Sequence, residues 1–172
     1  RDWGVKADVI GSCVWTYGAG VLTISACPGS APGILEPETV PTDTIGIIRF
    51  YPYYKHKKQI RKVIIEPGVT KIGAYAFSGM PYLEELVLPG TSTLTTVGDY
   101  AFFDTPFFSG IELDDTYDYP YGLPSTVQEI GDYAFANTDL YTFEIPKNCV
   151  SLGKGVIANT SVIQITSYTD NF

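Results

Sequence analysis

The chain has 172 residues, of which 19 are acidic and 11 basic, so its formal net charge is −8. This length suits one domain with a sizeable core, and thirteen tyrosines with nine phenylalanines argue against disorder. The negative charge argues against nucleic acid as a partner, and no apolar run reaches the roughly 18 residues of a membrane span. Because the sequence begins at Arg1 without a signal-like stretch, we interpret it as a mature or trimmed fragment.

A β-hairpin is the first element that the sequence predicts. Residues 13–17 and 21–24 flank a glycine-rich turn at residues 18–20. Both segments show the alternation of apolar and polar residues that is typical of half-buried strands.

Two of the three cysteines flank this hairpin. A disulfide between Cys13 and Cys27 would close its base, and unbonded thiols are the alternative. Pairing about Ala19 sets Cys13 opposite Ser25, so the bond requires a bulge or an offset. Cys149 falls at the start of a later repeat and is expected to be a buried free thiol. Cysteine usage thus permits an oxidising compartment without proving one.

A basic and aromatic segment follows at residues 49–62. It holds six of the eleven basic residues: Arg49, Lys55, Lys57, Lys58, Arg61 and Lys62. One interpretation is a patch for anionic polymers, and the favoured one is a solvated edge where the amino-terminal part meets the first repeat. The only histidine, His56, is interpreted as a solvated loop residue rather than a catalytic one.

A short phrase then returns four times. Its copies begin at Ile72, Val97, Ile130 and Leu152, each followed by glycine, and the first three continue to Tyr-Ala-Phe. The copies start 25, 33 and 22 residues apart, so the middle repeat carries an insertion of about ten residues. Self-similarity with this period predicts a solenoid, and the repeat length falls in the leucine-rich-repeat range of about 20–29 residues.

A second element recurs between these phrases, with the template Leu-x-x-Leu-x-Ile-Pro. It covers residues 60–65, 83–89, 140–146 and, more loosely, 108–113. The alternation predicts a strand with one buried face, and the closing proline fits the end of a strand. The residues expected to point inward and stack in one parallel sheet are Val63, Ile65, Leu86, Leu88, Ile111, Leu113, Phe143 and Ile145.

Charges on adjacent strands are predicted to pair in this sheet. Arg61 and Lys62 would lie beside Glu84 and Glu85 of the next repeat. Each such pair contributes about 0.2–1 kcal/mol, so the pairs support the register.

Glycine, alanine and phenylalanine have predicted roles in the repeated phrase. The glycine suits either a positive φ or a close approach of two backbones. Alanine before phenylalanine leaves space, and one helical turn is expected at Tyr-Ala-Phe. An aromatic spine in the core is predicted from Phe77, Phe102 and Phe135.

The insertion in the middle repeat combines carboxylates with tyrosines. Sugar- and peptide-binding loops use this mixture, and a variable solvated insertion is the favoured alternative. Its spacing lacks the Asp-x-Asp-x-Asp-Gly of a calcium loop. The candidate binding residues here are Asp115, Tyr117, Asp118, Tyr119 and Tyr121.

No catalytic or metal-binding motif is present in the sequence. It has no Cys-x-x-Cys, His-x-x-x-His or phosphate-binding glycine loop. The pairs Glu84-Glu85 and Asp114-Asp115 are adjacent in sequence, so each pair points to opposite sides of a strand or lies in a loop, and neither indicates an acid–base couple. We therefore expect neither an enzyme nor a cofactor or metal site.

These repeats resemble the BspA-type leucine-rich-repeat family of bacterial surface proteins. The family's repeat is similar to Val-Thr-x-Ile-Gly-x-Tyr-Ala-Phe followed by Leu-x-x-Leu-x-Ile-Pro, and residues 69–89 match it almost throughout. Residues 15–25 are similar to the segment that precedes many such arrays. The resemblance covers residues 13–25 and 52–165, whereas residues 26–48 fit no family pattern and the last copy lacks both Tyr and Phe.

The resemblance implies a mainly β fold with short helical turns: a right-handed leucine-rich-repeat solenoid of about four to five coils with an amino-terminal β-hairpin cap. We expect residues 1–56 to form the cap and lead-in, and residues 57–172 to form the solenoid as one continuous unit. The carboxyl-terminal edge, from Ile163 onward, shows no obvious cap. Either more chain follows it, or it associates edge to edge with another molecule.

The resemblance also implies a non-catalytic binding module, extracellular or at the cell surface, that adheres to a protein or glycan of a host or neighbouring cell. The alternative is a structural spacer or an accessory, carbohydrate-binding region of a larger surface protein or enzyme. The candidate binding face comprises the residues that alternation leaves outside the core: Arg61, Lys62, Ile64, Glu84, Glu85, Val87, Glu112, Tyr141, Thr142 and Glu144.

Overall fold

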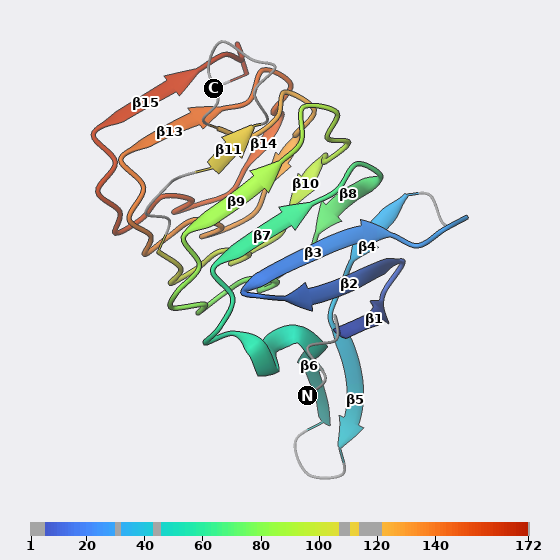
Figure 1. The fold of residues 1–172 in the computed structure, drawn as a ribbon. Coiled ribbons are helices and arrows are strands. Elements are labelled where there is room, and N and C mark those ends of the chain that lie inside the picture. Colours follow the sequence, from blue (N-terminus) through green and yellow to red (C-terminus); the bar gives the residue numbers. More distant parts are fainter. Residues whose placement is uncertain (1–5, 30–31, 43–45, 107–110, 114–121, 172) are drawn as a thin grey trace.

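The computed structural model describes residues 6–29, 32–42, 46–106, 111–113 and 122–171. The fold is mainly β, and the 3-10 helix η1 (Pro52–His56) is the only helix in these ranges. Figure 1 shows sheet A in front and sheet B behind it. Sheet A runs in the order β1 (Lys6–Ile10), β2 (Cys13–Gly18), β3 (Val21–Ala26), β7 (Lys62–Ile65), β9 (Glu85–Leu88) and β11 (Ile111–Leu113). Sheet B runs in the order β14 (Ser151–Leu152), β12 (Glu129–Ile130), β10 (Thr96–Val97), β8 (Val69–Ile72) and β4 (Gly33–Leu35).

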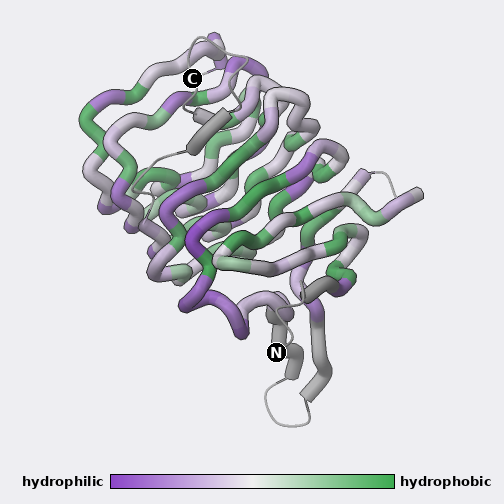
Figure 2. The backbone as a smooth tube through the Cα atoms, in the orientation of Figure 1, coloured by the Kyte–Doolittle hydropathy of each residue, from purple (hydrophilic) through white to green (hydrophobic). Residues whose placement is uncertain are grey.

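Successive repeats add strands to two parallel ladders. In sheet A, β7 pairs in parallel with β9 and β9 with β11, as the template predicts. In sheet B, β8, β10, β12 and β14 pair in parallel in the same sequential order. The alternation in β7 and β9 places Val63, Ile65, Leu86 and Leu88 fully inside the core, and Figure 2 shows these strands as largely hydrophobic.

The expected single sheet is interrupted after β11, in the middle repeat. Strands β13 (Thr142–Ile145) and β15 (Gln164–Ser167) pair in parallel with each other in a separate two-stranded sheet. The interruption follows β11, where the middle repeat carries its extra residues. Phe143 and Ile145 of β13 are nevertheless buried as predicted, whereas the side chains of β11 lie outside the described residues.

The predicted hairpin forms from β2 and β3, and it continues sheet A because β3 pairs in parallel with β7. A two-residue turn closes it, with φ of 49° at Ala19 and 83° at Gly20. This turn shifts the register by one residue, so Cys13 lies opposite Ala26 rather than Ser25. A separate antiparallel hairpin, β5 (Glu38–Thr42) with β6 (Gly46–Phe50), projects from the amino-terminal end in Figure 1.

An aromatic column fills the space between the sheets. The ring centroids of Phe77 and Phe102 are 5.2 Å apart, as are those of Phe102 and Phe135, and all three side chains are fully buried. Tyr53 of η1 extends the column at 5.9 Å from Phe77. The predicted spine is therefore confirmed.

Close approach of backbones explains the glycine of each phrase. A Cβ on Gly98 would lie 2.7 Å from the Ala74 nitrogen, and one on Gly131 would lie 2.5 Å from the Asp99 nitrogen. Neither glycine has a positive φ. Of the two predicted roles, close packing between repeats is the correct one.

The positive φ falls on the tyrosine instead. Tyr75, Tyr100 and Tyr133 have φ of 60°, 55° and 54°, and the expected helical turn at Tyr-Ala-Phe is wrong because a left-handed residue interrupts a right-handed helix. The rings stack at 4.9 and 5.2 Å. In the fourth copy, where tyrosine is lost, Gly155 occupies the site with φ of 58°.

Amides of each tyrosine turn donate hydrogen bonds to carbonyls of the next repeat. Three such bonds of 2.7–3.0 Å join the first repeat to the second: Tyr75 N to Asp99 O, Phe77 N to Ala101 O, and Gly79 N to Phe103 O. The equivalent carbonyls of the first repeat (Ala74, Ala76 and Ser78) have no earlier tyrosine turn to supply their donors.

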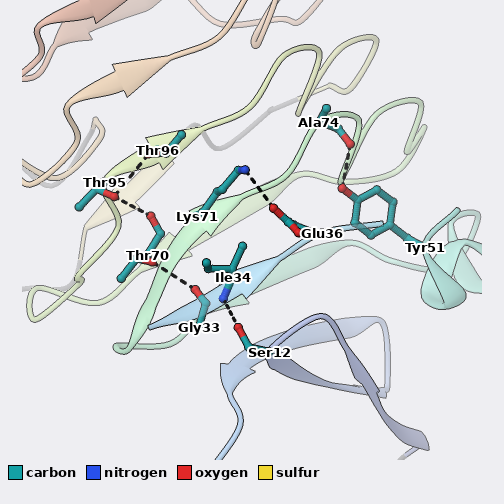
Figure 3. Close-up of polar contacts among 10 residues, drawn as sticks. All are labelled: Ser12, Gly33, Ile34, Glu36, Tyr51, Thr70, Lys71, Ala74, Thr95 and Thr96. Atoms are coloured by element: carbon teal, nitrogen blue, oxygen red, sulfur yellow. Dashed lines mark hydrogen bonds and ion pairs between the residues drawn. The ribbon is translucent and has the colours of Figure 1, made fainter. Parts of the chain in front are cut away.

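Tyrosine hydroxyls around η1 supply those donors. Tyr51 Oη donates to Ala74 O at 2.8 Å (Figure 3) and Tyr53 Oη to Ala76 O at 2.9 Å. Tyr54 Oη donates to Ser78 O at 3.2 Å and also to Tyr75 O. Three phenols therefore take the place of the amides of a preceding repeat.

Candidate functional site

The outward face of sheet A holds most of the predicted binding residues. Thr23, Ile64 and Val87 occupy directly adjacent register positions across β3, β7 and β9. All three are half-buried rather than fully buried. They form a row with an apolar centre. Because side chains alternate along each strand, this row points away from the core.

Two ion pairs lie on one side of this row, at the amino-terminal ends of β7 and β9. Arg61 Nη1 lies 2.8 Å from Glu84 Oε1, and Lys62 Nζ lies 2.7 Å from Glu85 Oε1, so the predicted cross-strand pairing is confirmed. The four charges neutralise one another. This leaves little free positive charge on the face for an anionic polymer.

The remaining candidates lie on or beside β13, outside sheet A. Tyr141 is 68% exposed, and Thr142 is exposed beside it. Glu144 is half-buried and lines a cavity described below. The side chain of Glu112 lies outside the described residues, and so do the insertion candidates Asp115, Tyr117, Asp118, Tyr119 and Tyr121.

The basic segment forms an edge supported by aromatic contacts. Lys55, Lys57 and Lys58 are exposed, and Figure 2 shows the stretch between η1 and β7 as hydrophilic. Lys55 Nζ lies 5.6 Å from the Trp15 ring centroid. The interpretation of His56 as a solvated residue is wrong, because its ring is half-buried and stacks on Tyr17 at 4.3 Å.

All three cysteines are free thiols in the structure, and Cys149 is buried as expected. Cys13 is buried, and Cys27 is half-buried. Burial, and to a smaller extent the charge of the Cys27 thiolate, raises the pKa of the Cys13 thiol to about 11. The two thiols are thus neighbours, and their disulfide stays a prediction for oxidising conditions.

The outward side of sheet B uses its polar groups to hold the repeats together. Figure 3 shows Thr95 Oγ1 donating to Thr70 O at 3.0 Å and Lys71 Nζ paired with Glu36 at 3.1 Å. The Asp99 and Asp132 carboxylates in the cavity on this side accept backbone amides of the following repeats at 2.7 and 2.9 Å. These groups are committed to structure, which makes this side the weaker candidate for a ligand.

A cavity beside the carboxyl ends of β9 and β13 was not predicted from the sequence. It has a volume of about 400 Å³, and equivalent prolines of three repeats, Pro89, Pro124 and Pro146, line it. Leu123, Thr126, Glu144, Lys147 and Tyr168 complete the lining together with Gly90, Ser92 and Ser125. Desolvation raises the pKa of the Glu144 carboxyl above its usual range. The sequence signal was the proline that directly follows the template at Leu88-Pro89 and Ile145-Pro146.

Within the described ranges, no group of three or more His, Cys, Asp or Glu side chains is arranged to hold a metal ion. The same ranges contain no helix long and apolar enough to cross a membrane.

Comparison with known proteins identifies the repeat. The model of the BspA type leucine rich repeat region matches residues 46–171 in six copies, so the chain belongs to the BspA-type leucine-rich-repeat family. No curated protein matches the sequence.

A solved bacterial structure shares the fold. A leucine-rich repeat protein from Eubacterium ventriosum superimposes with a TM-score of 0.65 at 25% identity over 92% of this chain. One from Bacteroides ovatus gives 0.48 at 16% identity over 92%, and the pneumococcal vaccine antigen PcpA gives 0.43 at 18% over 94%. The chain spans 39%, 40% and 50% of these three proteins, respectively.

Proposed function

We propose that this chain is a non-catalytic protein-interaction module displayed outside the cell, which binds a macromolecule of a host or neighbouring cell through the outward face of sheet A. The observation that carries the proposal is the adjacent row of Thr23, Ile64 and Val87 beside two neutralised ion pairs. Interfaces typically place apolar contacts at their centre and charged pairs at their rim. Membership of the BspA-type family supports display at the cell surface.

We further propose that the repeats wind into a right-handed solenoid and that the β2–β3 hairpin caps its first turn. Parallel strands joined by crossovers are right-handed in about 98% of cases, and both ladders are parallel. The direct pairing of β3 with β7 covers the strand edge that the first repeat would otherwise expose.

A binding screen with paired surface variants tests the proposed face. The purified chain would be applied to immobilised extracellular-matrix proteins and to a glycan array. Ile64→Glu/Val87→Glu alters the centre of the face at outward positions. Gln128→Glu, at an exposed position next to β12, is the matched control on the other sheet, and circular dichroism would verify that each variant is folded.

We expect binding to a protein surface that the Ile64→Glu/Val87→Glu variant loses at least tenfold and the control retains. Loss only with Tyr117→Ala/Tyr119→Ala would move the site to the insertion, and a response on the glycan array alone would favour a carbohydrate-binding accessory role. No binding to any surface would refute the adhesion proposal and favour a spacer. We also propose that the chain associates edge to edge through β15, as expected from the sequence. Sedimentation at increasing protein concentration tests this association.

A further inference from the structure

The cavity between the three equivalent prolines, here called the proline pocket, has the dimensions of a ligand site. Its volume of about 400 Å³ lies within the range of about 300–1,000 Å³ that small-ligand pockets occupy. Pro89, Pro124, Pro146 and Leu123 make its walls mostly apolar, and the ring of Tyr168, which is 55% exposed, lies at its edge.

Two polar groups in the proline pocket lack partners in the described part of the chain. Thr126 Oγ1 is buried without a hydrogen-bond partner. The Glu144 carboxylate has no described cation within 4.0 Å, although Lys147 lies three residues further along the chain and is exposed. A half-buried carboxylate and a buried hydroxyl that lack partners both favour a ligand that donates hydrogen bonds.

We infer that the proline pocket binds the basic side chain of an extended polypeptide partner. The alkyl stem would pack on the prolines and Leu123, and the cationic head would donate hydrogen bonds to Glu144 and Thr126. The inference deepens the proposed function, on which it rests, by specifying the chemistry of one contact.

Charge favours a basic side chain over a neutral sugar. The chain carries a net charge of −8, which attracts cationic partners over a distance of about 10 Å at moderate salt. Only a cation offsets the charge of Glu144, and desolvation of this carboxylate strengthens a charge-assisted hydrogen bond to it. Arginine suits the site better than lysine because its planar fork binds a carboxylate with two donors.

Titration with blocked pentapeptides tests this inference directly. The probe has one arginine among glycines, and its matched control has citrulline, which is nearly isosteric but neutral. Affinities would be measured by NMR titration on the full chain. The variants are Glu144→Gln, Thr126→Val and Lys147→Gln, with Glu129→Gln, an exposed carboxylate on sheet B, as the control.

We expect the arginine peptide to bind at least about tenfold more tightly than the citrulline peptide. Glu144→Gln should abolish that preference, Thr126→Val should weaken binding a few-fold, and Glu129→Gln should change nothing. Lys147→Gln should strengthen binding a few-fold, because it removes a like charge near the site. This gain cannot result from misfolding.

Equal affinity for both peptides, no binding of either, or an unchanged preference in Glu144→Gln would overturn the inference. Equal binding of free arginine amide and the pentapeptide would also overturn it, because the polypeptide would then contribute nothing. The proposed function is tested separately through the face of sheet A. Loss of protein binding in Ile64→Glu/Val87→Glu with no peptide preference would refute the inference and leave the proposed function intact.

Discussion

Removing the hydroxyl of Tyr53 tests how the first repeat is terminated. Tyr53 is fully buried, and its Oη donates to Ala76 O at 2.9 Å. Tyr53→Phe removes this donor and keeps the ring, which packs 5.9 Å from Phe77 and 6.1 Å from Trp15. The substitution therefore isolates the hydrogen bond from the packing.

The expected loss follows from the buried carbonyl that remains. A backbone acceptor left unsatisfied in the core costs about 1–3 kcal/mol. In a chain of this size, each kcal/mol corresponds to a change of about 2–4 °C in Tm. We expect Tyr53→Phe to lower the free energy of unfolding by about 2 kcal/mol and Tm by about 4–8 °C.

Urea and thermal unfolding, followed by circular dichroism, would measure this loss. Tyr100→Phe is the matched control, because its ring stacks equally closely and no described group accepts a bond from its hydroxyl. The control should stay within about 0.5 kcal/mol of the parent chain. Equal stability of the two variants would show that the phenols do not replace the amides of a preceding repeat.

Three further predictions concern the core, the ion pairs and the thiols. Phe102→Ala in the centre of the aromatic column should cost about 3–5 kcal/mol in urea unfolding; a loss below 1 kcal/mol would contradict a packed column. A double-mutant cycle on Lys62 and Glu85 should give a coupling of about 0.2–1 kcal/mol that shrinks at high salt, whereas a salt-independent value would argue against pairing. Because burial raises the pKa of Cys13 from 9.0 to about 11, the folded state favours the neutral thiol, so stability should be constant below pH 9 and fall as the pH rises to about 11. Mass spectrometry should show iodoacetamide alkylating the half-buried Cys27 before Cys13 at pH 8.5, and the reverse order would refute the burial argument.

The sequence predicts those features that depend on period alone. The template placed β7 and β9, their buried residues and the pairing of Lys62 with Glu85, because a parallel register repeats the same offset in every repeat. The phenylalanine column was predictable for the same reason: identical residues at identical positions of stacked repeats must lie above one another.

The left-handed tyrosines were not predicted, because a positive φ normally indicates glycine, asparagine or aspartate. At Tyr75, the hydrogen bond from its amide to the Asp99 carbonyl and the stacking of its ring on Tyr100 offset the backbone strain of the positive φ. The signal was in the degraded copy, where Gly155 replaces tyrosine at a φ of 58°. A glycine that substitutes for a larger residue in one copy can thus reveal the backbone conformation of all copies.

The hydrogen bonds of the three phenols were likewise beyond prediction. Tyr51, Tyr53 and Tyr54 precede the first repeat, and nothing in their order shows which carbonyls lack donors. The need for donors becomes clear only when the direction of the hydrogen bonds between turns is known. Each turn donates to the next one, as Tyr75 N does to Asp99 O, so the carbonyls of the first turn lack donors. The aromatic enrichment of residues 49–62 was visible, but its purpose was not.

Position within the repeat limits where a ligand can bind. Turn amides and carbonyls, the glycine and the phenylalanine are all used in stacking, so substitution there destabilises the fold. Two kinds of position stay accessible: the outward residues of the strands, and the corners where strands end at proline. A perfect repeat would make every corner alike, yet the proline pocket lies where the middle repeat, 33 residues long, departs from the period. A departure from the period can create a concavity, and here it leaves Glu144 without an ion partner among the described residues. We therefore expect specificity at this corner and broad contact on the face of sheet A.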